Sequence, residues 1–195
     1  MKRKSNTEEK APIHCTTIPS PIGKLLLVAD AKVLLGLYFV GYDHIPETSR
    51  SWKRDDQHPI LQKTARELEE YFAGRRHEFS VPIRFAGTQL QQKIWQQIAR
   101  IPHGQTIAYS QLAKLAGSPR AIRAAGTTTG RNPIAIIVPC HRVIGKDGAL
   151  HGFAGGLDKK RFLLKHEGYI HDSFKPESPA AIRRNENRRL KRRRS

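Results

Sequence analysis

Cysteine is scarce in this sequence of 195 residues, which contains only Cys15 and Cys140. Two thiols are too few for a framework of disulfides, and no Cys-x-x-Cys spacing is present to indicate a zinc site. We therefore expect two free thiols and no bound metal. Cys15, within IHCTTIPS, is predicted to be a small buried hydrophobic residue.

Long apolar runs are absent as well. No stretch approaches the roughly 18 apolar residues of a membrane-spanning helix. The charged segment MKRKSNTEEK at the start is not followed by the apolar core of a signal peptide. The sequence therefore predicts a cytoplasmic protein, associated with the nucleoid if the source is bacterial, that makes no contact with a membrane.

Acidic residues are few: 17 Asp and Glu stand against 35 Lys and Arg, which gives a formal net charge of +18 and a pI near 10.4. Such an excess points to a polyanionic partner, most often a nucleic acid, with an anionic membrane surface as the weaker alternative. Residues 183–195, RRNENRRLKRRRS, carry eight basic side chains and one acidic one. This segment is predicted to be a disordered tail that binds phosphates without specificity.

The length of the chain suits one large domain or two small ones. Residues 1–11 are polar and are predicted to be disordered. Two apolar runs within residues 24–40, separated by Ala-Asp-Ala-Lys, predict a β-hairpin. A helix is then predicted to begin at Pro59 and to end at Gly74. The first part of the chain is therefore predicted to form a small α/β unit.

The second part of the chain has a helical pattern from Thr88 onward. Thr88 and Gln91 fit a capping box, in which each residue satisfies a backbone N–H of the other. Apolar residues then recur every four positions until Pro102 ends the helix. This half is predicted to be mostly helical.

Two short helices are predicted within YSQLAKLAGSPRAIRAAG, residues 109–126. Ser110 can cap the first helix and Gly117 can end it, whereas Ser118 and Pro119 fit the N-cap and first position of the second. Such a pair is typical of a helix-turn-helix that binds DNA. An ordinary αα-hairpin without a DNA-binding role is the alternative.

The predicted second helix is thin, because alanines surround Arg120 and Arg123. Small side chains let a helix come close to another surface, either a neighbouring helix or a nucleic-acid backbone. Arg123 among these alanines is therefore a long side chain that projects from a narrow helix.

A cysteine, a histidine and an arginine end the apolar segment IAIIVPCHR. The length and β-branching of residues 134–138 predict a strand buried on both faces. Cys140 beside His141 supplies a nucleophile and a base, since a nearby base or positive charge favours the thiolate. Neighbouring side chains on a strand point to opposite faces, so their contact requires a bridging water or a turn after Pro139. A structural histidine is the alternative interpretation.

A third group is needed to orient the imidazole, and Glu167 is one of a few candidate carboxylates downstream. A last helix is predicted with Asp158 as its cap and Gly168 as its stop. This places Glu167 at the C-terminus of the helix, where the dipole disfavours a carboxylate. A residue set against its local preference raises the question of a functional role.

Four motifs in this half of the chain are distinctive. They are IPHGQTIAYSQLA at 101–113, RAAGTTTGRNP at 123–133, PCHRVIG at 139–145 and GFAGGLDKKRFLLKHEGY at 152–169. Together they closely resemble the motifs of the O6-alkylguanine-DNA alkyltransferases, which transfer an alkyl group from damaged guanine to their own cysteine. A weaker likeness in IPSPIGKLLL and ELEEYFAGR extends the resemblance over roughly residues 17 to 171.

The resemblance implies catalytic roles for the residues that match the family's motifs. Cys140 accepts the alkyl group, His141 acts through a water as its base, and Glu167 polarises that histidine. Asn132 braces the turn that presents the cysteine. Tyr109 hydrogen-bonds to guanine N3 or protonates it as the base leaves. The implied reaction uses no cofactor and no metal.

The resemblance also implies how damaged DNA is held. The helix pair enters the minor groove, and the target nucleotide is flipped out because its O6 carbon is unreachable inside a duplex. Arg123 then fills the vacated space. The implied DNA contacts are Arg123, Tyr109, Ala121, Arg120 and Ser110. The implied substrate pocket consists of Val143, Phe153, Ala154, Gly155 and Ala135.

Some positions depart from the family pattern. Phe153 and Ala154 stand where a tyrosine and then often a serine or alanine precede the family's GGL, so the phenol is missing. Ala135 stands where some members have proline, which predicts a slightly roomier pocket. The zinc of some relatives is not expected, because Cys15 has no second thiol near it in the sequence. The basic tail lies outside the family pattern.

The implied fold is α/β (α+β). Residues 12–84 form an RNase H-like supporting domain, a small antiparallel sheet with a helix. Residues 85–172 form a mostly helical domain with the helix-turn-helix and a short sheet, and residues 173–195 form the tail. The implied function is DNA repair by a monomer that transfers the alkyl group of O6-alkylguanine, and of O4-alkylthymine, irreversibly to Cys140 in a suicide reaction.

Two other functions are compatible with parts of this pattern. One is a damage sensor that only binds the lesion, resembling the alkyltransferase-like proteins; Cys140 argues against it, because those relatives replace that residue. The other is a helix-turn-helix regulator, for which PCHRV and HEG would be incidental.

Overall fold

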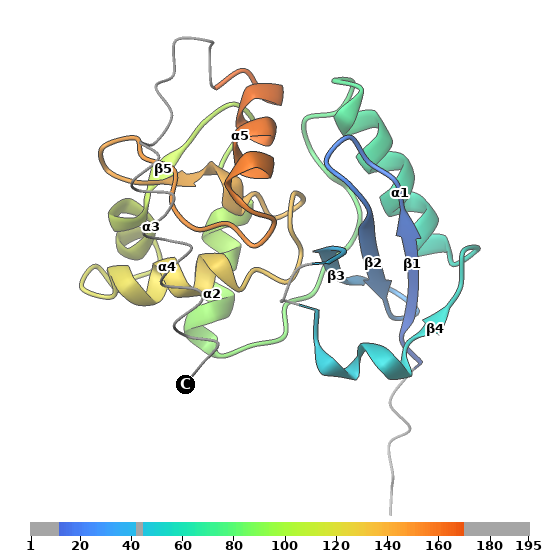
Figure 1. The fold of residues 1–195 in the computed structure, drawn as a ribbon. Coiled ribbons are helices and arrows are strands. Elements are labelled where there is room, and N and C mark those ends of the chain that lie inside the picture. Colours follow the sequence, from blue (N-terminus) through green and yellow to red (C-terminus); the bar gives the residue numbers. More distant parts are fainter. Residues whose placement is uncertain (1–11, 42–44, 170–195) are drawn as a thin grey trace, which may run out of the picture.

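The structure is a computed structural model that describes residues 12–41 and 45–169 in two halves (Figure 1). The disorder predicted for residues 1–11 and 173–195 lies outside the described residues. Within the described ranges, no helix combines the length and the apolar character that crossing a membrane requires.

The first half is a four-stranded sheet in the order β3-β2-β1-β4. Its strands are β1 (His14–Ile18), β2 (Leu25–Ala29), β3 (Leu34–Phe39) and the short β4 (Lys53–Arg54), which follows a 3-10 turn, η1 (Glu47–Ser51). The predicted hairpin is confirmed, since β2 and β3 pair antiparallel. Asp30 closes its turn by accepting hydrogen bonds from the backbone N–H groups of Lys32 and Val33, both at 2.9 Å. β4 pairs parallel to β1, which adds a short parallel strand to the predicted antiparallel sheet.

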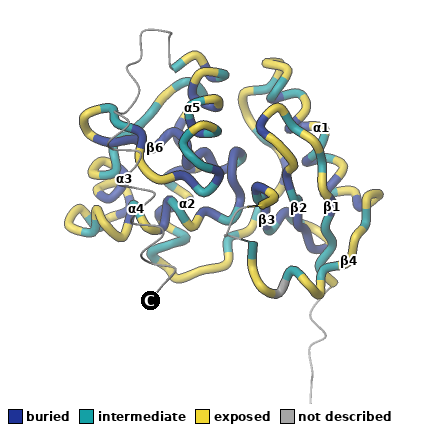
Figure 2. The backbone as a smooth tube through the Cα atoms, in the orientation of Figure 1, coloured by how far each residue is buried: buried dark blue, intermediate teal, exposed yellow. Residues whose placement is uncertain are grey.

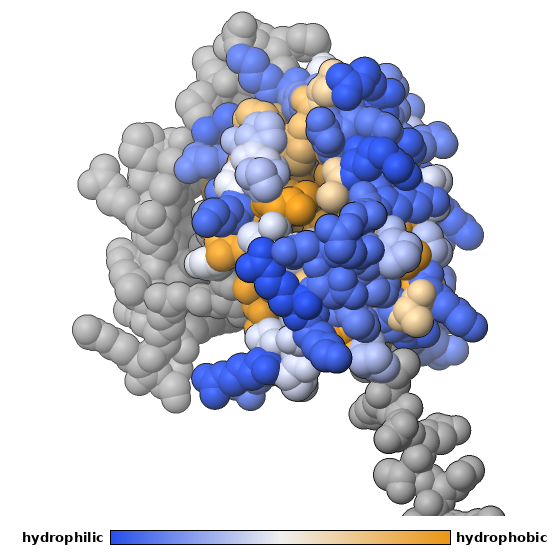
Figure 3. All heavy atoms as spheres, turned by 90° about the vertical axis from the view of Figure 1, so that its right-hand side faces the viewer, coloured by the Kyte–Doolittle hydropathy of each residue, from blue (hydrophilic) through white to orange (hydrophobic). Residues whose placement is uncertain are grey.

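Helix α1 (Pro59–Phe72) covers one face of this sheet (Figure 1). Pro59 occupies its first position and Gly74 follows its end with a positive φ of 71°, as the sequence predicts. One stripe of the helix is buried, and its members are Leu61, Thr64, Glu67, Leu68 and Tyr71. The outer surface of this half is mainly hydrophilic, with small hydrophobic patches (Figure 3).

The second half is mainly helical. Its helices are α2 (Gln89–Ala99), α3 (Tyr109–Leu115), α4 (Ile122–Gly130) and α5 (Leu157–His166), with the 3-10 turn η2 (Cys140–Arg142). Strands β5 (Ile107–Ala108) and β6 (Val143–Ile144) form a second, parallel sheet. The predicted capping box of α2 is confirmed: Thr88 N donates to Gln91 Oε1 at 2.9 Å, and Gln91 N donates to Thr88 Oγ1 at 3.3 Å.

Three predicted helix starts are wrong. Ser110 does not cap α3, because the chain leaves β5 directly into the helix and Ala108 becomes the N-cap. Ser118 and Pro119 form a turn instead of the start of α4, closed by Ala121 N donating to Ser118 O at 2.9 Å. Proline suits the second position of such a turn as well as the first position of a helix. Asp158 makes no capping bond, since the N-cap of α5 is Gly156.

The edge strand β3 joins the two halves. Leu37 N donates to Pro133 O at 2.9 Å and Ala135 N donates to Leu37 O at 3.1 Å. At the start of β3, Leu34 N donates to Pro82 O at 2.8 Å, a bond within the first half. One hydrophobic core contains residues from both halves, and both halves have buried stretches, dark blue in Figure 2. The second half is therefore built directly onto the sheet of the first.

A close approach of Gly155 to β3 gives a test of this junction. A Cβ added at Gly155 would lie 2.8 Å from two ring atoms of Phe39, whereas one added at Gly152 would meet no atom within 4 Å. We expect Gly155→Ala to lower the free energy of unfolding by about 1–3 kcal/mol, because the packed ring must move. Gly152→Ala should change it little. Urea denaturation measures both variants, and equal stabilities would contradict the packing described here.

Candidate active site

The segment before Cys140 is buried as predicted, but the predicted strand at 134–138 is wrong. Ile134 makes a single bridge to Leu37 of β3, and the chain then turns. Val138 N donates to Ile134 O at 3.0 Å, and Ile136 has a positive φ of 70°. The apolar composition of this segment is explained by its burial and does not require a sheet. Its β-branched side chains pack into the core although the backbone forms an irregular turn.

Asn132 holds this turn in place. Its side chain is buried, its Nδ2 donates to Val138 O at 2.7 Å, and its Oδ1 accepts from Ile134 N at 3.0 Å. A side chain that bonds to backbone groups on both arms of a turn competes directly with strand pairing. Asn132 thereby fixes the direction from which Pro139 leads into Cys140.

Cys140, His141 and Arg142 form the 3-10 turn η2, and all three are buried. A bridging water or a turn after Pro139 was expected to bring Cys140 and His141 together, and the turn is present. Burial raises the pKa of Cys140, while hydrogen bonding by Asn132 and the charge of Lys160 act in the opposite direction. The resting thiol is neutral, so an adjacent base must take up its proton.

His141 is hydrogen-bonded to the carboxylate of Glu167, with 2.8 Å between Nε2 and Oε1. Burial lowers the pKa of His141 more than Glu167 raises it, so the resting imidazole is neutral. An ionised carboxylate can only accept, which assigns the proton to Nε2 and leaves a lone pair on Nδ1. Within the described ranges, buried Nδ1 has no hydrogen-bond partner. A neutral imidazole with a free lone pair is able to act as a base.

Glu167 follows the last residue of α5, as predicted, and is only 6% exposed. Arg142 forms a two-pronged ion pair with it: Nε lies 2.8 Å from Oε2, and Nη2 lies 2.8 Å from Oε1. Burial acts to raise the pKa of Glu167, but the hydrogen bonds and charges of His141 and Arg142 outweigh it and hold the pKa well below its usual range. The carboxylate is therefore permanently charged at neutral pH.

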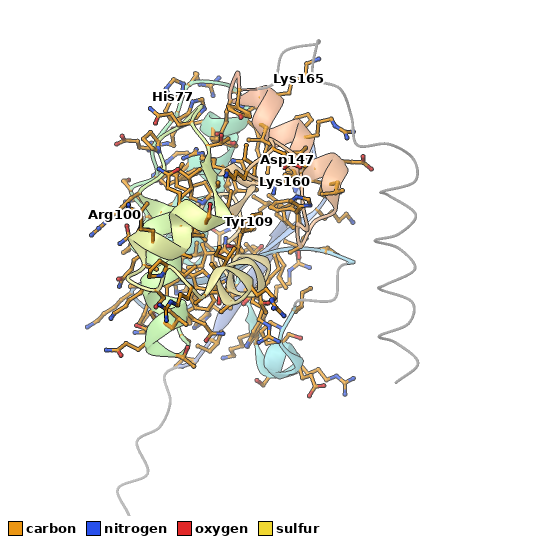
Figure 4. The ribbon with its side chains drawn as sticks, turned by 90° about the vertical axis from the view of Figure 1, so that its left-hand side faces the viewer. His77, Arg100, Tyr109, Asp147, Lys160 and Lys165 are labelled. Atoms are coloured by element: carbon orange, nitrogen blue, oxygen red, sulfur yellow. The ribbon has the colours of Figure 1, made fainter. Side chains whose placement is uncertain are left out.

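Tyr109 begins α3, and its hydroxyl lies 3.5 Å from the carbonyl oxygen of His151. Burial and the nearby Cys140 raise the pKa of Tyr109 to about 12, so the phenol keeps its proton. Lys160 on α5 places Nζ 5.9 Å from the centre of the Tyr109 ring. Both residues lie near the middle of the molecule in the view of Figure 4.

Lys160 is fully buried, which is rare for a lysine. Its Nζ donates to Val143 O at 2.7 Å and to His151 O at 2.9 Å. Val143 begins β6 and His151 belongs to the loop before α5. The ammonium group therefore ties together the two segments that follow Cys140.

The predicted pocket residues are only partly brought together. Ala135 and Ala154 line one small cavity, whereas Val143, Phe153 and Gly155 are buried outside its lining. The rest of that lining consists of Leu37, Tyr38, Phe39, Ile45 and Asn132. The cavity thus lies where β3 meets the 132–135 segment.

The predicted DNA contacts lie mostly on the surface. Arg123, Arg120 and Ser110 are exposed, and Ala121 is half-buried. Arg123 is on α4, but Arg120 lies in the turn before it, so the expectation that α4 carries both arginines is wrong. Within the described ranges, no cluster of three or more histidine, cysteine or acidic side chains is arranged to hold a metal ion.

Three residues of the site were missed in the sequence: Tyr71, Arg142 and Lys160. The hydroxyl of Tyr71 on α1 donates to Glu167 Oε1 at 2.7 Å. For two of them, Lys160 and Tyr71, the helical spacing in the sequence could have indicated a buried position. Lys160 lies seven residues before Glu167, and Tyr71 lies three after the buried Leu68. Polar residues on the buried stripe of a helix need partners, and here the partners belong to the site.

The fold and the site define a class of protein with a buried cysteine, histidine and carboxylate beside a pair of short helices. Two sequence models of one family match the chain: the ribonuclease-like domain of 6-O-methylguanine DNA methyltransferase over residues 13–85, and the DNA binding domain of the same family over residues 89–169. The chain belongs to the 6-O-methylguanine DNA methyltransferase family.

Individual relatives agree with this assignment. The chain is 41% identical over 156 residues to a methylated-DNA–protein-cysteine methyltransferase of Haemophilus influenzae, covering 80% of this chain and 86% of the relative. It is 45% identical over 149 residues to one from Methanosarcina acetivorans, covering 76% and 94%. The crystal structure of Mycobacterium tuberculosis OGT in complex with DNA is similar in fold, with a TM-score of 0.76 and 42% identity over 80% of this chain and 93% of that one.

The ion pair of Glu167 and Arg142 leads to a prediction about pH. The folded pKa of Glu167 lies below its unfolded value of about 4.3, so the stabilisation is fully present above that pH and is lost as the pH falls. Glu167→Gln leaves Arg142 buried without a counter-charge and should lower the free energy of unfolding at pH 7 by about 3–5 kcal/mol.

The difference between wild type and Glu167→Gln should shrink as the pH falls below about 4.3. Urea denaturation over a series of pH values measures it, with Asp158→Asn as the control, because Asp158 is fully exposed and its pair with Arg161 spans 3.8 Å. A difference that stays constant with pH would contradict the charged state assigned to Glu167.

Proposed function

We propose that this chain repairs DNA by direct reversal, with Cys140 as the acceptor of the alkyl group from O6-alkylguanine and also from O4-alkylthymine. As a member of its family the chain is a methylated-DNA–protein-cysteine methyltransferase. Sγ attacks the alkyl carbon, an S–C bond forms, and the bond from that carbon to O6 breaks. The thioether is stable, so each molecule reacts once.

The observation that carries this proposal is the buried relay from Cys140 through His141 to Glu167. Nδ1 of His141 holds the lone pair that takes up the thiol proton through a water, while Nε2–H remains bonded to Glu167. The carboxylate stabilises the imidazolium that forms, at a site where burial otherwise disfavours positive charge.

Tyr109 supplies the proton that the leaving guanine needs. Its pKa of about 12 keeps the phenol protonated at neutral pH, so it can donate to guanine N3 as charge develops on the base. Lys160 near its ring stabilises the negative charge that remains. Val143, Phe153, Ala154, Gly155 and Ala135 are the proposed walls of the pocket.

The proposed DNA surface consists of Arg123, Arg120, Ala121, Ser110 and Tyr109. The helix pair binds the minor groove, the damaged base is flipped, and Arg123 fills the gap in the stack. Its exposure and its place on the small-residue helix α4 support this role. We assign support to residues 12–84, and DNA binding and transfer to residues 85–172, in a cytoplasmic monomer.

Intact-protein mass spectrometry tests the acceptor. After incubation with a duplex that contains one O6-methylguanine, wild type should gain roughly 14 Da, one methylene unit, and the gain should saturate at one per molecule. Cys140→Ala should bind the same duplex and gain nothing, with Cys15→Ala as the control that still reacts. Tight binding of the lesion without a mass gain in wild type would replace this proposal with that of a damage sensor.

The role of Arg123 has a separate test. Arg123→Ala should slow methyl transfer from duplex DNA by about tenfold or more, because base flipping then costs a few kcal/mol that the arginine no longer offsets. Transfer from single-stranded DNA should change much less. Arg100→Ala removes one exposed charge from the end of α2 and is the matched control (Figure 4). Equal rates for Arg123→Ala and wild type on duplex DNA would refute the assignment.

A further inference from the structure

The carboxylate of Glu167 is contacted from the first half of the protein as well as from the second. Tyr71 on α1 is fully buried, and its hydroxyl donates to Glu167 Oε1 at 2.7 Å across a separation of 96 residues. The same oxygen accepts from His141 Nε2 and from Arg142 Nη2, each at 2.8 Å. Tyr71 and His141 therefore share one acceptor atom.

The hydroxyl of Tyr71 is a constant donor. Burial raises the pKa of Tyr71 far above its usual value, and the negative charge of Glu167 raises it further. The O–H group therefore keeps its proton at neutral pH. A donor of fixed charge that binds Oε1 draws electron density away from the atom that faces His141.

Packing accounts for the ring of Tyr71 but not for the position of its hydroxyl. The ring contacts aromatic neighbours on several segments: Phe72, Phe79, His103 and His166. A phenylalanine would make the same contacts. The hydroxyl instead meets the one carboxylate oxygen on which the proposed relay depends, rather than a backbone carbonyl.

We propose that Tyr71 is a positioning residue for alkyl transfer, which holds the Glu167 carboxylate toward His141 and sets how strongly that carboxylate attracts the imidazole proton. This inference rests on the proposed roles of Cys140, His141 and Glu167. The first half of the protein then completes the reaction centre, because the relay lacks one donor without α1.

Other charged and titratable groups around Tyr71, Glu167 and His141 also affect the protonation of His141. Arg142 and Lys160 disfavour positive charge on His141, and Glu167 favours it. His103 and His166 contact the ring of Tyr71, and His103 in turn stacks on His77 at 4.1 Å. Burial lowers the pKa of His103, which keeps this neighbour neutral near pH 7. The charged groups that act on the Tyr71 hydroxyl are Glu167 and Arg142.

Tyr71→Phe removes the hydroxyl and keeps the ring. In single-turnover assays with O6-methylguanine in duplex DNA, we expect the rate of methyl transfer to fall about tenfold, as for the loss of one hydrogen bond to a charged group. Without the Tyr71 donor, more negative charge remains on Glu167 Oε1, and this charge should hold the proton of His141 more tightly. The acidic limb of the pH–rate profile, and the pKa of His141 measured by NMR, should therefore both move to higher pH.

Thr64→Val is the matched control. Thr64 is buried on the same helix, and among the residues that the structure describes its hydroxyl bonds within α1, to Ile60 O at 2.7 Å. This variant loses a buried hydroxyl and should leave the transfer rate and its pH profile unchanged. Should Tyr71→Phe fail to fold, 3-fluorotyrosine incorporated at position 71 keeps the ring and strengthens the donor. It should move the pKa of His141 in the opposite direction, to lower pH.

The outcomes separate this inference from the proposed function. Wild type that gains no methyl group overturns the function itself. Wild type that reacts, together with a folded Tyr71→Phe variant of unchanged rate and pH profile, overturns the role of Tyr71 alone. A tenfold loss that Thr64→Val reproduces without any shift in pH profile also overturns it, because that loss would come from general loosening of α1.

Discussion

A single buried negative charge, the carboxylate of Glu167, organises the proposed reaction centre. A buried carboxylate is tolerated only when it is paired and its lone pairs are occupied. Here the charge is met by Arg142, and the remaining donors come from His141, Tyr71 and the backbone N–H of Gly104 at 3.4 Å. These donors lie on η2, on α1 and on the loop after α2, so the charge fixes three segments that are distant in the sequence.

The position of Glu167 also has an electrostatic cost. It follows the end of α5, where the helix dipole places partial negative charge. A basic residue would be favoured at this position, and the bidentate ion pair with Arg142 offsets the unfavourable interaction of the carboxylate with the helix dipole. The sequence therefore showed a carboxylate at an unfavourable helix end but not the ion pair that stabilises it. Arg142 is 25 residues away from Glu167, and its position depends on the turn at η2.

Local signals predicted the elements whose ends are determined by local bonds. The hairpin turn closed by Asp30, the start of α1 at Pro59 and the capping box of Thr88 all rest on contacts within a few residues. The strand expected at 134–138 failed because Asn132 bonds to both arms of a turn, and its apolar residues are buried in either conformation. The resemblance to the family pointed to the residues of the proposed relay. The contact of Tyr71 with Glu167 spans 96 residues, and only its place on the buried stripe of α1 hinted at it.

The junction at β3 has a consequence for how the protein avoids self-association. An open edge strand offers unpaired backbone groups to any other strand, which promotes aggregation. In this protein β3 is the edge of the sheet, and its N–H groups donate to Pro82 O within the first half and to Pro133 O of the second half. The opposite edge is β4, which has only two residues. Separation of the two halves would therefore expose backbone groups of this edge strand around Leu37 to other chains. The contact that supports the proposed reaction centre thus also protects the folded protein from association with its own copies.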